Sequence, residues 1–274
     1  LCLIIGVKKN LVNIFFCSSI YTLYFTGKRR FLLMKKITLP QTPLLVLSLS
    51  MFISQLGVGL VIPILPRYIE TFGANGAQLG YLVAAMGLTL FLFSPFTGAL
   101  SDRHGRKKLI VGGIGLFGLS QFIFGYTDKL WVLYLSRLIG GIGIACMSPA
   151  ITAYVTDITS LARRGQAHGW IGAAMSLGIV CGPGFGGLLA EYGLRVPFYI
   201  AAAAALMSMT ACMLLLPESL EQKAQLAARQ SPPDRKNVFS QLALSAAAPY
   251  FPLLIFIFVM TFGLANIEAI FGLY

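Results

Sequence analysis

Charged residues are scarce in this chain of 274 residues: they make up 11% of it, and only nine are acidic. Soluble domains average about 25% charged residues, so the usual water-facing surface is missing here. Apolar residues account for 57%, more than a water-soluble core of this size can bury. These proportions exclude a soluble globular domain and indicate that lipid surrounds much of the chain.

Cysteine and histidine are also sparse. The five cysteines are an odd number, and Cys146, Cys181 and Cys212 fall inside apolar runs. This placement argues against a disulfide framework and favours small packing residues. The two histidines, His104 and His168, lie in different connections between apolar runs, so we expect neither a metal site nor a cofactor.

Positive charge is the one kind of charge in excess, with a net value of +12. A nucleic-acid reader gathers its basic residues on one water-facing surface. Here they stand in short clusters between apolar runs, which is typical of the cytoplasmic loops of membrane proteins. We therefore expect no nucleic-acid partner.

Long apolar runs are abundant. A helix that crosses a bilayer needs roughly 20 apolar residues. Because the connections between the runs are mostly short, we expect successive helices to pack antiparallel as an up-and-down bundle in an all-α integral membrane protein. Seven runs have about this length: 44–65, 80–99, 109–126, 131–155, 169–190, 197–216 and 250–273.

The distribution of Lys and Arg predicts the orientation of these helices, since short cytoplasmic loops are enriched in both. Alternate connections on the other side carry only Arg67, Lys129 and Arg195. The N-terminus and the long loop after the sixth run are therefore predicted to be cytoplasmic. The basic residues of this set are Lys35, Lys36, Arg103, Arg106, Lys107, Lys108, Arg163, Arg164, Lys223, Arg229, Arg235 and Lys236.

The residues before Met34, the first methionine, are expected to be an upstream extension that is not native. Their apolar segment is short for a spanning helix and is interrupted by polar residues, although an additional helix is the rival interpretation. Only one helix follows the polar, proline-containing linker, so we expect a truncated chain. The predicted division is 1–33 extension, 34–216 six-helix bundle, 217–249 cytoplasmic loop and 250–274 seventh helix.

A charged signature runs from Gly98 to Lys108 between the second and third spans. It resembles, at every specified position, the loop signature G-x-L-x-D-R-x-G-R-K of the major facilitator superfamily. That family implies two six-helix bundles around a substrate cavity, of which this chain would supply the first bundle and the seventh helix. The residues that the resemblance assigns to conformational gating are Gly98, Asp102, Arg103, Gly105, Arg106 and Lys107.

Each residue of this signature has a physical reason. Gly98 lets helices approach closely, and Gly105 suits the turn. Asp102 can favour the positive end of the following helix while it pairs with Arg106. The alternative is a basic loop that serves only to orient the helices. Asp157, at the cytoplasmic end of the fourth span, is expected to be a cap or loop partner rather than a site residue.

A second signature lies in the fifth span and resembles the antiporter motif of drug:proton exchangers in the same superfamily. Its glycines can form a smooth face for close helix contact, and Pro183 is expected to bend the helix. The alternative is generic packing of small residues. The motif comprises Gly178, Gly182, Pro183, Gly186 and Gly187.

Two charged residues fall inside spans, where charge is costly and points to function. Arg137 resembles the family's fourth-helix arginine, which is implicated in proton transfer; the alternative is a structural arginine bonded to carbonyl groups. Glu268, in the seventh span, resembles a glutamate tied to proton coupling in bacterial multidrug exporters. A carboxyl group in low dielectric can exchange protons near neutral pH.

The resemblance implies a secondary transporter of the bacterial cell membrane that exports lipophilic or cationic drugs in exchange for protons. We expect a monomer whose partners are its substrate, protons and lipid. A carrier for a metabolite such as a sugar or siderophore, or an inactive truncated product, remains the alternative. An intramembrane enzyme is not expected, because the spans lack a nucleophile with its base.

Overall fold

The computed structural model describes residues 42–220 and, further on, 251–252, 255–256, 259–260 and 263. These residues are helical or lie in short connections, and no strand occurs among them. Two short helices, α3 (Leu65–Glu70) and η1 (Leu161–Arg163), join long ones. Among the described residues, six helices are long and apolar enough to cross a membrane, which confirms the predicted class. They are α2 (Thr42–Val61), α4 (Gly76–His104), α5 (Arg106–Tyr126), α6 (Leu130–Ile158), α7 (Arg164–Ala190) and α8 (Val196–Leu215).

The first span ends earlier than the sequence predicted, at Val61 instead of residue 65. A turn follows, and α3 then begins with Pro66 in its first turn. Proline is tolerated there because the N–H that it lacks would have no partner within the helix. The second span begins earlier than predicted, because Asn75 and Gln78 form a reciprocal capping box at the start of α4.

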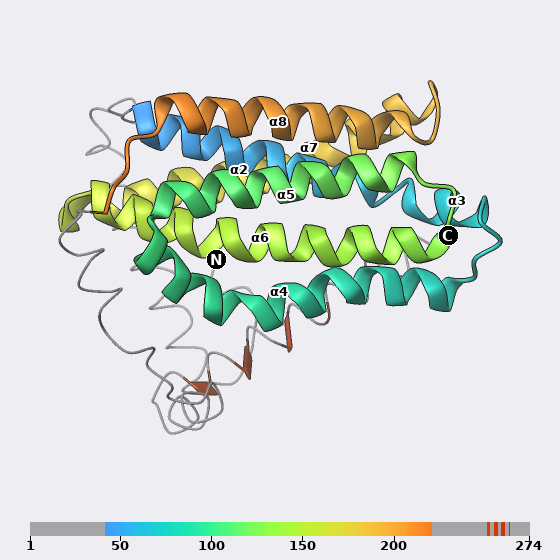
Figure 1. The fold of residues 1–274 in the computed structure, drawn as a ribbon, viewed down its shortest axis with the longest axis horizontal. Helices are drawn as coiled ribbons and strands as arrows, with labels where there is room; N and C mark the ends of the chain where they lie inside the picture. Colours follow the sequence, from blue (N-terminus) through green and yellow to red (C-terminus); the bar gives the residue numbers. More distant parts are fainter. Residues whose placement is uncertain (1–41, 221–250, 253–254, 257–258, 261–262, 264–274) are drawn as a thin grey trace, which may run out of the picture. The chain divides into compact units, whose positions relative to one another are not determined.

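Most successive helices are not each other's main neighbours, so the predicted up-and-down packing order is wrong. Only α5 and α6 are adjacent in sequence and also pack extensively. Otherwise α4 packs on α6, α8 packs on α5 and α2, and α7 packs on α2. The lateral order is therefore α4, α6, α5, α8, α2, α7, with α4 and α8 on opposite sides in Figure 1.

Small residues at the contacts explain this order. A Cβ added to Gly113 of α5 would lie 2.6 Å from the carbonyl oxygen of Gly143 in α6. A Cβ added to Gly118 would lie 3.0 Å from the Cβ of Ala205 in α8. Lipid tails are as apolar as leucine, so burial alone favours no particular partner in a membrane. Helices settle where missing side chains let their backbones approach.

Two apolar clusters form the interior, one toward each end of the helices. Near the start of α5 the cluster includes Phe117 and Tyr154. Toward the other end, Phe198 packs against Tyr68 and Phe124 with ring centroids 5.0 and 4.8 Å apart. The Tyr68 hydroxyl donates a 2.9 Å hydrogen bond to the Phe124 carbonyl, which ties α3 to α5.

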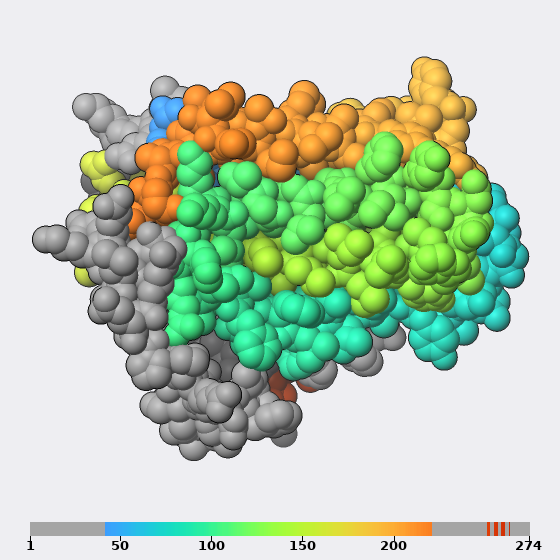
Figure 2. Space-filling model, in the orientation of Figure 1, coloured from blue at the N-terminus to red at the C-terminus, as the bar shows by residue number. Residues whose placement is uncertain are grey.

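Helices α4 and α7 differ from the other spanning helices because most of their surface is exposed. In their most apolar stretches only 11% and 17% of residues are buried, against 56% in α2 and α5. Figure 2 shows α4 at the edge of one face, below α6, α5 and α8. Within the described residues, these two helices end the lateral order and have one main neighbour each.

Candidate functional site

The connection between α4 and α5 is a single residue, Gly105. Its φ of 99° lies in the region that glycine adopts without strain, as expected for the turn. The predicted charged turn from Gly98 to Lys108 is otherwise helical, because α4 continues to His104 and α5 begins at Arg106. The signature therefore presents its charges on two helix ends and not on a loop.

Arg106 lies at the centre of a charge cluster at this end of the bundle. Its Nη2 is 3.2 Å from Oδ1 of Asp102, which confirms the predicted pair. Its Nε also forms an ion pair with Oδ2 of Asp157, at the end of α6. The Arg106 side chain is only 12% exposed, so these ion pairs lie in a partly dry environment. Three helices thus meet through one guanidinium group, and Asp157, which was expected to be a cap or loop partner and not a site residue, is part of this cluster.

Two further basic residues of the signature lie at the same two helix ends. Arg103 and Lys107 are half-buried. Gly98 was expected to let another helix approach, but no atom of the described chain lies within 4 Å of a Cβ placed there. That expectation is not met within the described residues.

Glu218, one acidic residue of the site, was not among the residues predicted from the sequence. It follows α8, and its Oε1 accepts hydrogen bonds from the backbone N–H groups of Arg106 and Lys107 at 2.9 and 3.4 Å. Beside it, the Ser219 hydroxyl donates to Oδ2 of Asp157 at 3.1 Å. Three of the chain's nine acidic residues therefore gather at the start of α5. This scarcity of acids could have directed attention to Glu218.

Arg137 of α6 is buried, with 6% of its surface exposed. Its guanidinium carbon lies 4.2 Å from the centre of the Phe124 ring, a cation–π contact. Nη1 lies 4.0 Å from the Met86 sulfur. Nη2 is buried and has no hydrogen-bond partner among the described residues. The Arg137 guanidinium therefore packs on an aromatic ring, and no described carbonyl accepts a hydrogen bond from Nη2.

The glycine motif of α7 separates into two faces. Gly178, Gly182 and Gly186, spaced one turn apart, are buried against the backbone of α2. Pro183 and Gly187 point elsewhere and are exposed, and α7 continues as a helix through the proline. The motif thus contains one face for close packing within the bundle and one that no described helix covers.

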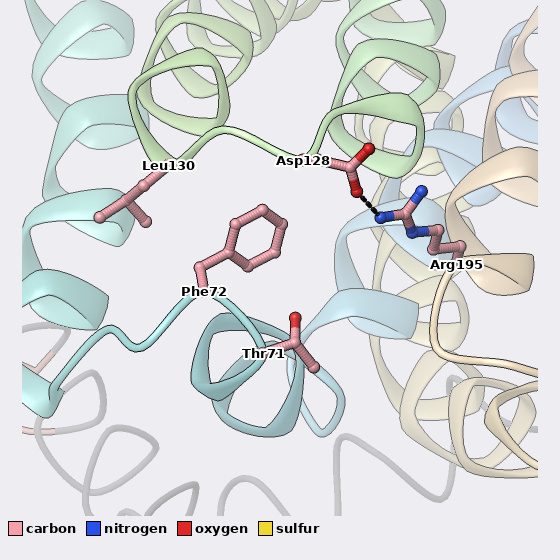
Figure 3. A pocket seen from close by; sticks show the side chains of 5 residues that line it. All are labelled: Thr71, Phe72, Asp128, Leu130 and Arg195. Carbon is pink, nitrogen blue, oxygen red and sulfur yellow. Dashed lines mark hydrogen bonds and ion pairs between the residues drawn. The ribbon is translucent and has the colours of Figure 1, made fainter.

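A shallow pocket of about 380 Å³ lies at the opposite end of the bundle, between the end of α3 and the starts of α6 and α8. Its lining includes an ion pair between Arg195 and Asp128, and this hydrogen bond raises the pKa of the Arg195 guanidinium. Figure 3 shows Thr71 and Phe72, after α3, pointing toward the connection that carries Asp128. The structure places none of the predicted site residues there.

Glu268 and the rest of the predicted seventh span lie largely outside the described residues, as does the extension 1–33. Among the described residues, Arg137 is far along α6 from the Asp157 end, so the structure separates the proton-coupling candidate from the charge cluster. Cys146, Cys181 and Cys212 are free thiols.

Similar proteins place these helices in a family. The chain is 40% identical over 242 residues to Multidrug resistance protein 2 of Bacillus subtilis, covering 88% of this chain and 60% of that protein. It is 33% identical over 229 residues to the quinolone resistance protein NorA of Staphylococcus aureus, covering 84% of this chain and 57% of NorA. The chain therefore spans somewhat more than half the length of these relatives.

Solved structures share the fold. The human organic anion transporter MFSD10 superposes with a TM-score of 0.58 and 25% identity over 68% of this chain and 50% of that one. A bacterial homologue of the human lysosomal transporter Spinster, inward-facing and occupied, gives a TM-score of 0.61 at 22% identity, over 65% of this chain and 44% of that one. The family model of the Major Facilitator Superfamily matches residues 47–274. The chain belongs to the Major Facilitator Superfamily.

Proposed function

We propose that these helices are part of a secondary transporter that exports lipophilic or cationic small molecules in exchange for protons, by alternating access. The observation that carries the proposal is the 40% identity to a protein named for multidrug resistance, over 242 residues. Transport, and not catalysis, is the activity we assign.

Gating is assigned to the signature residues Gly98, Asp102, Arg103, Gly105, Arg106 and Lys107. The ion pairs of Arg106 with Asp102 and Asp157 join α4, α5 and α6 at one end of the bundle. Ion pairs that are partly buried have discrete made and broken states, so they can stabilise one conformation of a two-state transporter. The cluster would then close the cytoplasmic side of the cavity in one of the two states.

Proton coupling is assigned to Arg137 and Glu268. Arg137 is a buried cation with no carboxylate partner among the described residues. A buried cation of this kind attracts a carboxylate or responds to its charge, so it can sense whether a nearby acid is protonated. Within the antiporter motif, Gly178, Gly182 and Gly186 would supply the face on which α7 packs against α2 and moves along it.

The exposed faces of α4 and α7 support an apolar substrate. Phe91 and Phe96 of α4 are 73% and 64% exposed, and Val180 and Leu188 of α7 are exposed as well. Pockets for drug-sized ligands are lined mainly by apolar and aromatic side chains. Such faces suit lipophilic cations better than sugars, which need many hydrogen-bonding groups.

We assign the protein to the bacterial cell membrane as a monomer, with its N-terminus and the loop 217–249 in the cytoplasm. The positive-inside rule supports this orientation, because basic residues cluster at the Arg106 end.

Efflux of ethidium from energised cells tests the proposal, using the complete reading frame that carries this sequence, with and without a protonophore. We expect dye export that stops when the proton gradient is dissipated. Glu268→Gln should abolish gradient-driven export, while the matched variant Glu191→Gln, outside the proposed relay, should not. If cells that express the unmodified protein do not export the dye, a metabolite carrier replaces the drug exporter as the proposed function. If cells that express Glu268→Gln export the dye normally, the coupling role of Glu268 is wrong.

A further inference from the structure

The start of α5 carries the wrong charges for a helix N-terminus. Its first turn contains Arg106, Lys107 and Lys108 and no acidic residue. Gly105, the residue before it, offers no side chain to cap the free N–H groups. A helix N-terminus has unpaired N–H groups and a partial positive charge, so it favours anions and disfavours cations. Asp102 was expected to favour this helix end while it pairs with Arg106, and its ion pair with the Arg106 side chain leaves the free N–H groups in need of a second acceptor.

Glu218 supplies it from 112 residues away. Its Oε1 accepts from the N–H of Arg106 at 2.9 Å and from that of Lys107 at 3.4 Å. These are the first two amides of α5, which have no carbonyl partner within the helix. The carboxylate therefore stands where the side chain of an N-cap residue ordinarily stands, and its charge opposes the helix dipole.

The segment that carries Glu218 is itself held from two sides. The hydroxyl of Tyr154, a fully buried residue of α6, donates a 2.8 Å bond to the Pro217 carbonyl. The Ser219 hydroxyl donates to Asp157, the same carboxylate that pairs with Arg106. Glu218 is thus fixed between two residues that are anchored to α6. A carboxylate held in this way can orient the helix end that it caps.

We propose that Glu218 is a positioning residue that caps α5 from the end of α8 and holds Arg106 where it reaches both Asp102 and Asp157. The capping depends only on the contacts at the start of α5. Its consequence for transport rests on the proposed function. Glu218 lies outside the loop signature, so it extends the gating machinery to the first residues after the sixth span.

Amide hydrogen exchange, resolved to single residues by mass spectrometry, tests the capping on the purified full-length protein. In Glu218→Ala the amides of Arg106 and Lys107 should exchange about tenfold faster or more, because bonds to charged acceptors are stronger than neutral ones. Glu218→Gln, which keeps a neutral acceptor, should be intermediate. Glu191→Ala, which alters an exposed glutamate directly after α7, should leave both amides unchanged.

The amides deeper in α5 distinguish capping from unfolding. If only the first two amides respond, the capping stands. If Glu218→Ala accelerates exchange throughout α5, the variant has loosened the whole helix. The test then rests on Glu218→Gln, which preserves the shape of the side chain: faster exchange at Arg106 and Lys107 alone supports the capping. If neither variant alters exchange at Arg106 and Lys107, the inference is overturned.

A transport measurement tests the positioning role separately. Because the cluster lies at the helix ends and acts on a conformational step, Glu218→Ala should lower the maximal efflux rate severalfold at an unchanged half-saturating dye concentration. Glu218→Gln should retain more activity, at equal amounts of protein in the membrane. Changed exchange with an unchanged maximal rate would overturn the positioning role. If the unmodified protein exports no dye, the proposed function fails, and the exchange data still decide the capping.

Discussion

Gly59 of α2 and Gly182 of α7 meet backbone to backbone: a Cβ placed on Gly182 would lie 2.6 Å from the Cα of Gly59. One turn to either side, a Cβ placed on Gly178 would lie 2.6 Å from the carbonyl oxygen of Phe52, and one placed on Gly186 would lie 2.5 Å from that of Leu60. Contacts this short involve backbone atoms, which cannot rotate away as a side chain can. The α2–α7 contact therefore requires glycine over two full turns.

Gly182→Ala is expected to destabilise the protein by about 1–3 kcal/mol, because the added methyl group forces two backbones apart. Gly184→Ala is the matched control on the same helix, since no described atom lies within 4 Å of a Cβ there. It should be neutral or slightly stabilising, because alanine favours helix more than glycine does. Melting temperatures in detergent, read by fluorescence-detected size exclusion, compare the two; equal melting would refute the close contact.

Asp157→Asn is expected to lower stability more than Asp128→Asn, although each aspartate pairs with an arginine. The Asp157 and Arg106 side chains are 28% and 12% exposed, whereas those of Asp128 and Arg195 are 79% and 42% exposed. An exposed pair contributes about 0–1 kcal/mol. The loss at Asp157 should be about 1–3 kcal/mol, since it also leaves a half-buried cation with one bond fewer.

Salt distinguishes these two pairs further. Raising the ionic strength should reduce the effect of Asp128→Asn toward zero and leave most of the effect of Asp157→Asn, because partly buried charges are screened less. Thermal melts of both variants at low and high salt provide the measurement. A larger loss for Asp128→Asn would contradict the burial difference.

Phe124→Leu is expected to destabilise the protein more than Phe122→Leu, its control two residues away. The Phe124 ring lies under the Arg137 guanidinium and is 1% exposed, while Phe122 is 49% exposed. A double-mutant cycle with Arg137→Met should give a coupling energy of about 0.5–2 kcal/mol for a cation–π contact. Additive effects would show that the ring merely packs.

Cysteine labelling tests the assigned orientation. In a protein without native cysteines, His104→Cys at the Arg106 end should be shielded from a membrane-impermeant maleimide added to intact cells. Lys129→Cys, at the end that carries the Arg195 pocket, should react, because both side chains are exposed but lie at opposite ends of the helices. Labelling of His104→Cys alone would reverse the orientation.

The helices themselves could be predicted from the sequence because their causes are local. A run of about 20 apolar residues must be helical in lipid, where every backbone N–H needs a partner within its own segment. The Asp102–Arg106 pair was also predictable, since residues four apart lie on one face of a helix. The early end of α2 was missed because an apolar run continues through a turn and into α3.

The sequence by itself determined the membrane class, the spans that lie within the described residues and the identity of the charged signature, since all three depend on local composition and short spacing. Only the tertiary structure decided which helices are neighbours and that Glu218 caps α5. In lipid an apolar face gains little by choosing one helix over another, so the partner depends on where glycines on two distant segments coincide. Gly59 and Gly182, or Glu218 and Arg106, are separated by more than a hundred residues, and no local pattern encodes their meeting.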